Sequence, residues 1–362
     1  MKVDYLVVGS GLTGAVIART LADLNRDVLV VDRRPHIGGN VHDHTHESGI
    51  KIHTYGPHYF RTSSDRIWEW VNRFSEFNYF AARVGTVVDD QVERWPLAES
   101  YVRRRSGDNW TPSFNGTPSN FEEAALSLMP VDIYRDFVKE YNEKQWGVQC
   151  TELDAELCKR FDVRSTDESR LTPNAKHQGL PKHGYASMTQ EMFRGIPLLL
   201  NFDYLKRKEE LTAKKALIFT GPIDEFYDFE YGRLHYRGQK RTHHYDPDAN
   251  FIQKREQLNN PTHRGGEHIR TIEWKHLMLP DIGNRIKGSV VTTETPYSPT
   301  DPSCYEYPFP SKENRKLYKQ YRSRVDSTDG LFIAGRLGEY RYYDMDQAIG
   351  RAMTIAEKVM EV

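Results

Sequence analysis

A glycine-rich turn near the N-terminus constrains the fold more than any other feature of the sequence. A β-favouring run, residues 5–8, leads into Gly9, Gly11 and Gly14, and a helical pattern follows to about residue 24. In such a turn the first glycine permits the bend, the second lets backbone approach a pyrophosphate, and the third lets helix and strand pack. The helix N-terminus supplies N–H donors. The spacing therefore predicts an α/β fold that opens with a dinucleotide-binding, Rossmann-like unit.

A second glycine-rich turn favours FAD over NAD. Another β-favouring run, residues 28–31, closes at Asp32, whose carboxylate is placed to accept a hydrogen bond from an adenosine ribose hydroxyl. Gly38, Gly39 and Asn40 follow soon after this acid. The order resembles the acid-basic-x-x-x-Gly-Gly pattern of flavoproteins with a two-dinucleotide-binding fold. We therefore expect FAD as the cofactor.

Two arginines leave a competing interpretation open. Arg33 and Arg34 directly follow the acid. In NADP enzymes an arginine near this position accommodates the 2′-phosphate of the cofactor. NADP is therefore the chief alternative to FAD.

Two later segments return to the nucleotide-binding fold. Residues 216–219 predict a core strand before a glycine turn, and residues 331–334 predict another that ends near Arg336. A helix that starts near Asp344 would bring backbone donors toward the flavin ring end, while Arg336 would meet the pyrophosphate. The expected FAD-binding domain is discontinuous and comprises residues 1–66, 197–230 and 326–362.

The rest of the chain predicts two additions to the nucleotide-binding domain. Residues 120–146 show helical spacing of apolar side chains, and short β-favouring runs such as 269–272 and 289–293 are separated by turns. The expected additions are a helical insertion domain at residues 98–160 and an antiparallel β-sheet domain at residues 67–97, 161–196 and 231–325.

An aromatic stripe in the helical segment is a candidate base-binding site. Phe137 and Tyr141 are four residues apart and share one helix face, and Trp146 follows near the helix end. Such a stripe is more often part of a core. Basic residues elsewhere favour a ligand, because two arginine forks from separate segments would hold a diphosphate. The basic residues in question are Lys159, Arg160, Arg164 and Arg270.

Composition argues against two kinds of partner. Lys plus Arg number 50 and Asp plus Glu 51, so the net charge of −1 gives no global attraction to nucleic acid or an anionic membrane. The longest nearly unbroken apolar stretch, residues 196–200, is far shorter than a bilayer span. The start of the chain lacks the order of a secretion signal. We expect a cytoplasmic protein without integral membrane contact.

Histidine spacing raises one metal hypothesis. His42, His44 and His46 alternate, so on a strand they would face one way like metal ligands. No convincing set of carboxylates or cysteines accompanies them, and a polar hairpin explains the pattern. The three cysteines are too scattered for a zinc cluster. We therefore expect no metal site.

Six blocks of the sequence, taken in order, resemble the UDP-galactopyranose mutase family. The blocks containing EKQWG and GRLxEYxYYDM are specific to that family. The resemblance covers nearly the whole chain and implies an FAD domain that carries a helical bundle and a sheet. The six blocks are residues 9–14, 33–40, 55–58, 142–147, 220–224 and 335–345.

The resemblance implies a flavin-dependent isomerase. In the family, reduced FAD attacks the anomeric carbon through N5 and expels the nucleoside diphosphate; the sugar then opens as a flavin iminium and recloses through a different hydroxyl, without net oxidation. The implied substrate is a pyrimidine-diphosphate sugar, first of all UDP-galactopyranose, which becomes UDP-galactofuranose for cell-surface polysaccharide. The alternatives are the same chemistry on UDP-N-acetylgalactosamine or dTDP-fucose, an FAD-dependent oxidase or dehydrogenase, and a sugar-nucleotide sensor without turnover.

The resemblance also assigns site residues by position. The implied substrate contacts are Phe137 and Tyr141 at the base, Asn142, Trp146 at the sugar side, Arg160 and Arg270 at the diphosphate, and Tyr307, Tyr342 and Asp344 at the phosphate and sugar end. Tyr305 is the alternative to Tyr307. The implied catalytic residues are Arg160, Arg270, His58 and Arg61. Arg160 would lie on a mobile lid, residues 151–180, that excludes water. The expected cofactor contacts are Gly9, Gly11, Thr13, Gly14, Asp32, Arg33, Gly38, Gly39, Asn40, His58, Arg336 and Met345.

Three departures from the family pattern put the sugar in question. The family's H-x-F-H-T pattern has Arg61 in place of its second histidine, which adds a permanent charge and suits a different sugar substituent such as an acetamido group. Ala82 stands where the family has an asparagine of the sugar pocket. The lid has no tyrosine between residues 161 and 184, where Leu171 and His177 occur. The helical segment at residues 96–120 is shorter than the corresponding segment of the family. A homodimer is expected, but the family's dimer geometry is therefore not carried over to this chain.

Overall fold

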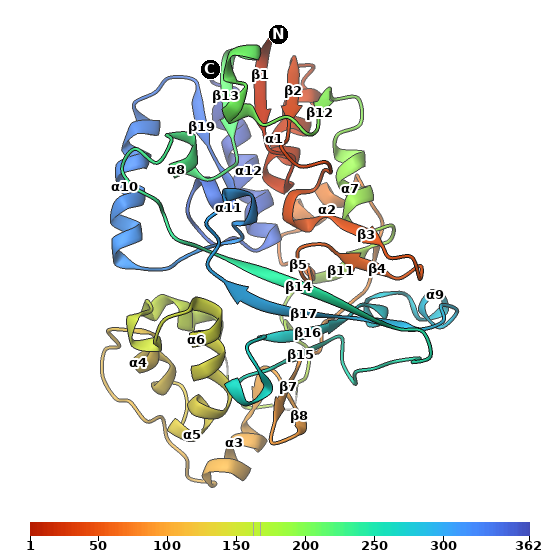
Figure 1. The fold of residues 1–362 in the computed structure, drawn as a ribbon, viewed down its shortest axis with the longest axis vertical. Coiled ribbons are helices and arrows are strands. Elements are labelled where there is room, and N and C mark those ends of the chain that lie inside the picture. Colours follow the sequence, from red (N-terminus) through yellow and green to blue (C-terminus); the bar gives the residue numbers. More distant parts are fainter. Residues whose placement is uncertain (162, 167) are drawn as a thin grey trace.

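A parallel five-stranded sheet forms the nucleotide-binding part of the fold (Figure 1). The computed structural model describes residues 1–161, 163–166 and 168–362, with only the backbone of Arg160. Neighbouring strands of the sheet come from three distant parts of the chain, and all pairs are parallel. The strand order is β12 (Leu198–Leu199), β2 (Val28–Val31), β1 (Lys2–Val8), β13 (Thr212–Phe219) and β19 (Leu331–Ile333).

Helices cover both faces of this sheet because its central strands are apolar on both sides. Tyr5 and Val7 of β1 pack in one core with helices α1 (Leu12–Asp23), α7 (Tyr185–Met192) and α12 (Met345–Val359). Leu6 and Val8 point the other way, into a core shared with α8 (Ile223–Phe226) and α10 (Lys312–Asp326). The strand period of two thus places a layer of helices on each side.

A seven-stranded sheet lies beside the nucleotide-binding part. Its longest ladder joins β14 (Tyr236–Asp246) to β17 (Ser289–Tyr297) in antiparallel register. The expectation of an antiparallel sheet is corrected at one place, because β15 pairs with β7 in parallel. The full order is β18 (Tyr307–Pro308), β14, β17, β16 (Arg270–Glu273), β15 (Gln257–Asn259), β7 (Gly85–Val88) and β8 (Gln91–Arg94).

The helical region is broken into short pieces. Pro130 lies at the N-cap of α5 (Val131–Ile133), which separates it from α4 (Phe121–Leu126). A π-helical segment, η2 (Tyr134–Lys139), then leads into α6 (Glu140–Trp146). The helical spacing noted over residues 120–146 is therefore carried by several short helical segments. The expected shared face of Phe137 and Tyr141 is retained, since both side chains line one cavity.

Shorter elements complete the chain. β3 and β4 form the polar hairpin expected around His44. Among the described residues, no helix has the length and apolar character to cross a bilayer. The remaining elements are β3 (Asp43–Thr45), β4 (Lys51–His53), β5 (Phe60–Thr62), α2 (Asp65–Asn72), β6 (Phe77–Asn78), β9 (Leu97–Ala98), α3 (Glu99–Ser106), β10 (Val163–Arg164), β11 (His177–Pro181), α9 (Pro280–Gly283), α11 (Gly335–Gly338) and short 3-10 turns, among them η4 (Ala155–Arg160).

Candidate active site

The two glycine-rich turns lie against each other at the carboxyl edge of the parallel sheet. Gly11 and Gly38 form a parallel β-bridge. A Cβ on Gly14 would lie 2.0 Å from the carbonyl oxygen of Gly9, and a Cβ on Gly39 would lie 2.7 Å from the Cα of Gly11. The turns therefore pack at a distance that only glycine allows, and they leave the α1 N-terminus open to an anion.

A cavity of about 190 Å³ lies over these turns. Gly14 alone among the expected cofactor residues is absent from its described lining, because it packs beneath the turn, as the third glycine of such a turn does. The expected residues that line the cavity are Gly9, Gly11, Thr13, Asp32, Arg33, Gly38, Gly39, Asn40, His58, Arg336 and Met345. Sequence reasoning missed residues 202–205, which follow β12, and Ser303. The signal for the former was their position at a strand's carboxyl end.

Asp32 and the arginine that follows it are both held by contacts within the protein. Its carboxylate accepts hydrogen bonds from the Ser10 N–H at 2.6 Å, the Ser10 hydroxyl at 2.7 Å and the Arg34 N–H at 2.8 Å. Arg33 forms a two-pronged ion pair with Glu225 at 2.8 and 2.6 Å. Burial lowers the pKa of Arg33, but the hydrogen bond and charge of Glu225 outweigh it and raise the pKa. Both the acid and the first arginine thus have partners within the protein.

Arg34 lies across the aromatic ring of Tyr55. Its guanidinium carbon is 4.4 Å from the ring centroid. It also donates a hydrogen bond to Asn40 Oδ1 at 2.9 Å. These contacts fix Arg34 between the second glycine-rich turn and a residue that lines the neighbouring cavity.

A second cavity, of about 640 Å³, adjoins the first. His58, Arg336 and Met345 line both cavities. The structure also brings together nearly all expected substrate and catalytic residues in the second cavity. They are His58, Arg61, Phe137, Tyr141, Asn142, Trp146, Arg270, Tyr307, Tyr342 and Asp344. The side chain of Arg160 and residues 162 and 167 of the expected lid lie outside the described residues.

Several lining residues were missed by sequence reasoning. Tyr59 and the pair Trp95 and Pro96 are examples, and so are Gln257 and Asn259, which project from β15. Strand alternation gave a signal for the last two, because residues two apart face the same side of a strand. The structure places the two candidate tyrosines, Tyr307 and Tyr305, in different surroundings. Tyr307 lines the cavity, whereas Tyr305 is buried in the core and stacks on Tyr236 at 4.2 Å.

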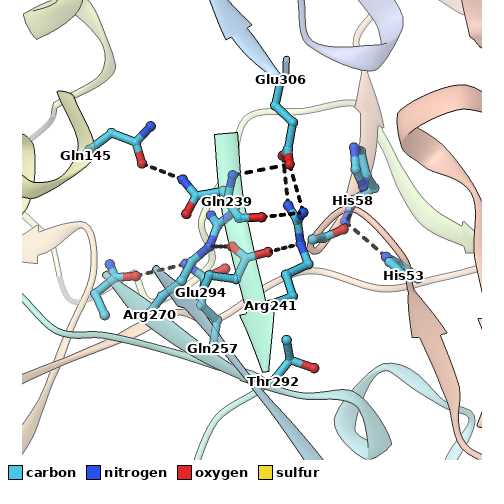
Figure 2. Close-up of polar contacts among 12 residues, drawn as sticks. His53, His58, Gln145, Gln239, Arg241, Gln257, Arg270, Thr292, Glu294 and Glu306 are labelled. Atoms are coloured by element: carbon cyan, nitrogen blue, oxygen red, sulfur yellow. Dashed lines mark hydrogen bonds and ion pairs between the residues drawn. The ribbon is translucent and has the colours of Figure 1, made fainter. Parts of the chain in front are cut away.

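A buried ion network holds Arg270 (Figure 2). The carboxylate of Glu294, which is 0% exposed, accepts from Nε of Arg270 at 2.5 Å and from Nε of Arg241 at 2.8 Å. Arg241 also pairs with both oxygens of Glu306 at 2.8 Å. Burial lowers the pKa of Arg270, but the charge of Glu294 more than reverses this effect and raises the pKa well above its usual value. Arg270 therefore remains charged at the wall of the cavity.

The charge of the cavity suits an anion. Asp344 is the one carboxylate among its described lining residues, and it forms an ion pair with Arg61 at 2.9 Å. Arg164 also lines the cavity, but it donates to the backbone carbonyls of Glu168 at 3.3 Å and Leu171 at 2.8 Å, so it organises its own loop. The cationic side chains that line the cavity are Arg61, Lys159, Arg164, Arg270 and Arg336.

His58 is held as a neutral ring where the two cavities meet. Burial, followed by the positive charge of Arg336, lowers its pKa to about 3. Its Nδ1 lies 2.7 Å from the carbonyl oxygen of Gly56, which accepts, so Nδ1 carries the proton. Nε2 is then an acceptor.

Two residues that depart from the family pattern, Ala82 and His177, lie away from the described lining of the second cavity. Ala82 is buried, its carbonyl accepts the N–H of Leu171 at 2.7 Å, and it is absent from the described lining of the cavity. His177 stacks on Trp68 and pairs with Asp65 instead of facing the cavity. Leu171 does line it. Over the described ranges, no three His, Cys, Asp or Glu side chains are grouped to hold a metal ion.

Comparison with known proteins decides the family. Residues 136–342 match the family model of UDP-galactopyranose mutase, and residues 7–74 match that of an NAD(P)-binding Rossmann-like domain. A probable UDP-galactopyranose mutase of Klebsiella pneumoniae is 31% identical, over 99% of this chain and 94% of its own length. The chain belongs to the UDP-galactopyranose mutase family. The family resemblance and the fold class expected from the sequence are thereby confirmed.

Other similar proteins support the assignment to the UDP-galactopyranose mutase family. A dTDP-fucopyranose mutase of Escherichia coli is 29% identical over 97% of both chains, and a UDP-galactopyranose mutase of Mycoplasma pneumoniae is 28% identical over 99% of this chain and 97% of its own. The crystal structure of a reduced UDP-galactopyranose mutase matches with a TM-score of 0.73 at 15% identity, over 99% of this chain and 96% of that one, and shows the shared fold. The chain is thus an enzyme of the isomerase class, from a family that acts on nucleotide sugars.

Proposed function

We propose that the protein binds FAD in the glycine-lined cavity and interconverts the pyranose and furanose forms of a nucleotide sugar in the adjoining one, with UDP-galactopyranose as the first substrate. The observation that carries the proposal is that His58, Arg336 and Met345 line both cavities. A dinucleotide that extends from Asp32 along α1 would bring its ring end to this border. The sugar would meet it there.

The arginine contacts favour FAD over NADP. A 2′-phosphate would have to displace Glu225 from Arg33 or Asn40 from Arg34. It would also approach the carboxylate of Asp32, which repels it. A ribose hydroxyl instead finds in Asp32 an acceptor with about four lone-pair sites, of which three are used by the chain.

The residues of the substrate cavity bind, orient and shield. When bound and reduced, FAD supplies the nucleophile, its N5, for the anomeric carbon. Phe137 and Tyr141 stack on the pyrimidine, while Arg270 and Arg160 hold the diphosphate and stabilise its charge as it departs. The neutral ring of His58 borders the reacting centre without adding charge. A lid of residues 151–180 closes over the sugar and excludes water.

A second candidate is the same chemistry on another sugar. The ion pair of Arg61 with Asp344 at the cavity wall motivates it, because breaking or keeping that pair would place different donors beside the sugar. The candidates are UDP-N-acetylgalactosamine and dTDP-fucose. An amine-oxidising enzyme is disfavoured, since a wall with five cationic side chains repels a protonated amine. A homodimer and a cytoplasmic location stay predictions.

The test is a reaction with the chemically reduced enzyme. Purified protein is expected to be yellow and, after dithionite treatment, to convert UDP-galactopyranose into a product of identical mass and a different NMR spectrum. The same assay with N-acetylgalactosamine, fucose and arabinose nucleotides identifies the preferred sugar. Aerobic turnover without reductant, or a carbonyl product lighter by two hydrogens, would contradict the proposal. Binding without any isomerisation would favour a sensor.

A further inference from the structure

One lysine in the EKQWG block is buried among backbone carbonyls. The Lys144 side chain lies on α6, and the residue is 6% exposed. No carboxylate of the described residues lies within ion-pair distance of its ammonium group. Nζ is instead within hydrogen-bond distance of four carbonyl oxygens, those of Asn260 at 2.9 Å, Thr262 at 2.8 Å, Gly266 at 3.1 Å and His268 at 2.9 Å.

These carbonyls belong to the loop of one β-hairpin, and the strand residues on either side of that loop line the substrate cavity. The loop joins β15 to β16, and its flanking residues, Asn259 and Arg270, are paired across the two strands and both line the cavity. On the helix side, Asn142, Gln145 and Trp146 line the same cavity. Lys144 therefore joins the wall that carries the aromatic residues to the wall that carries Arg270.

A second buried cation holds the last turn of the same helix. Arg237, on β14, is 6% exposed and donates from Nε to the carbonyl of Gln145 at 2.7 Å and from Nη2 to that of Lys144 at 3.0 Å. Nη1 donates to the hydroxyl of Ser298 at 2.5 Å. Carbonyls in the last turn of a helix lack intrahelical partners, and a cation is stabilised there by the helix dipole.

The glycine of the same block makes room for this cation. Gly147 ends α6 with a φ of +73°. A Cβ at this position would lie 2.9 Å from Nη1 of Arg237. The lysine and the glycine of EKQWG therefore serve the same junction between helix and sheet.

We propose that Lys144 and Arg237 are positioning residues that set the distance between the base-binding helix and Arg270. The proposal rests on the proposed function. A nucleoside diphosphate spans both walls, so a fixed distance lets its second contact form without a further loss of freedom. A ligand that touches one wall gains nothing from this fixation. Lys144 thus strengthens the binding of the intact nucleotide more than that of its parts.

The experiment compares Lys144→Met with a matched control, Lys275→Met. Lys275 has a similar carbonyl cage, with Ile286 at 2.8 Å and Gly288 at 3.0 Å, and is 2% exposed, but it is absent from the described lining of the cavity. Affinities for UDP, uridine and pyrophosphate are measured by calorimetry on the holoenzyme. In Lys144→Met we expect a UDP affinity about 30-fold weaker, with uridine and pyrophosphate changed less than about threefold. KM is expected to rise in proportion and kcat to change less than about threefold. Lys275→Met is expected to leave all these values unchanged.

Equal weakening of UDP and uridine in Lys144→Met, unchanged UDP affinity, or the same loss in Lys275→Met would overturn the proposal. If Lys144→Met does not fold, Gly147→Ala replaces it, because its Cβ displaces Arg237; Gly195→Ala, with φ +76° and nothing within 4 Å, is its control. If the wild-type protein does not bind UDP, the proposed function fails by itself. Amide hydrogen exchange in residues 260–270 then tests whether Lys144 holds this loop in place. Faster exchange in the variant supports the positioning role, and unchanged exchange contradicts it.

Discussion

The two cavities of this enzyme are built in opposite ways. The glycine-lined cavity, which we call the cofactor cavity after its proposed ligand, is shaped largely by backbone turns, and within residues 8–41 closely packed glycines set the approach of the chain. The substrate cavity is shaped by large and charged side chains from many separate segments. Its central cation, Arg270, depends on Glu294 from the neighbouring strand. Backbone shape is thus encoded locally, whereas a constellation of side chains is encoded by distant partners.

The largest effect is expected from Arg270→Ala. The change removes the cation from the cavity wall and leaves Glu294 buried with one guanidinium partner fewer, so kcat/KM is expected to fall about 10³-fold. Steady-state kinetics of the reduced enzyme measure it, and the flavin absorbance at the start shows that the cofactor is retained. Arg270→Lys, which keeps the charge and loses the fork, is expected to fall by a smaller factor. Retention of more than a tenth of the activity in Arg270→Ala would break the contrast between the cavities.

The next largest effect is expected from Glu294→Gln, which lowers the stability of the folded protein. The buried carboxylate lies between two guanidinium groups, so its neutralisation leaves two cations facing each other and lowers the free energy of unfolding by about 3 kcal/mol. Urea unfolding of the holoenzyme measures the change. The matched control is Glu93→Gln, which loses only a surface pair with Arg104 and should cost less than about 1 kcal/mol. Similar values for the two variants would contradict a role for the buried network.

The cofactor cavity is tested by Gly39→Ala. The new Cβ would meet Gly11 Cα at 2.7 Å with φ at +55°, so the two turns must separate, and FAD affinity is expected to fall about 10-fold. Fluorescence titration of the apoprotein with FAD measures it. Gly107→Ala, at φ +90° with nothing within 4 Å, carries the strain without the close approach and should leave FAD affinity unchanged. With FAD saturating, UDP affinity should be unaltered in both variants.

The last prediction concerns pH and a histidine that is buried beside the cavities, and its effect is small at neutral pH. Burial lowers the pKa of His53 to about 3, whereas in the unfolded chain it is about 6.5. Between these values the unfolded state binds more protons, so the free energy of unfolding falls as the pH drops below 6.5, by up to about 1.4 kcal/mol per pH unit. His53→Gln keeps an acceptor for the His58 N–H and is expected to reduce this slope. Urea unfolding from pH 7.5 to 5 measures it, with the half-exposed His263→Gln as a control that should keep the slope.

The sequence predicted the glycine-rich part of the cofactor cavity because the determinants of that part lie close together in the chain. The strand that ends at Gly9, the acid at Asp32 and the second glycine-rich turn all lie where the pattern indicated. The later strands β13 and β19 were also predicted, since a strand buried on both faces is a continuous apolar run. The break at Pro130 was available in the sequence as well.

The rest depended on strand register and order, which a single sequence does not specify. Glu294 meets Arg241 across 53 residues, and only the pairing of β14 with β17 brings them together. Lys144 reads as an ordinary charged helix residue, yet its partners lie in a loop more than a hundred residues later. The parallel pairing of β15 with β7 was not predicted either, because a single sequence does not specify the order of strands in a sheet. Charged residues are predicted to be exposed unless their partners are known.

The π-helical segment η2 contains one residue more than a regular helix of the same number of turns. A π-turn holds one residue more than an α-turn, and each residue of an α-helix turns the chain by about 100°. Loss of one residue within Tyr134–Lys139 would therefore convert the π-turn into an α-turn and leave the orientation of α6 nearly unchanged. Loss of one residue inside α6 itself, between Glu140 and Trp146, has no such extra turn to absorb it and would rotate Trp146 by about 100°, away from the cavity. A single-codon deletion is thus expected to be more harmful in α6 than in the segment directly before it.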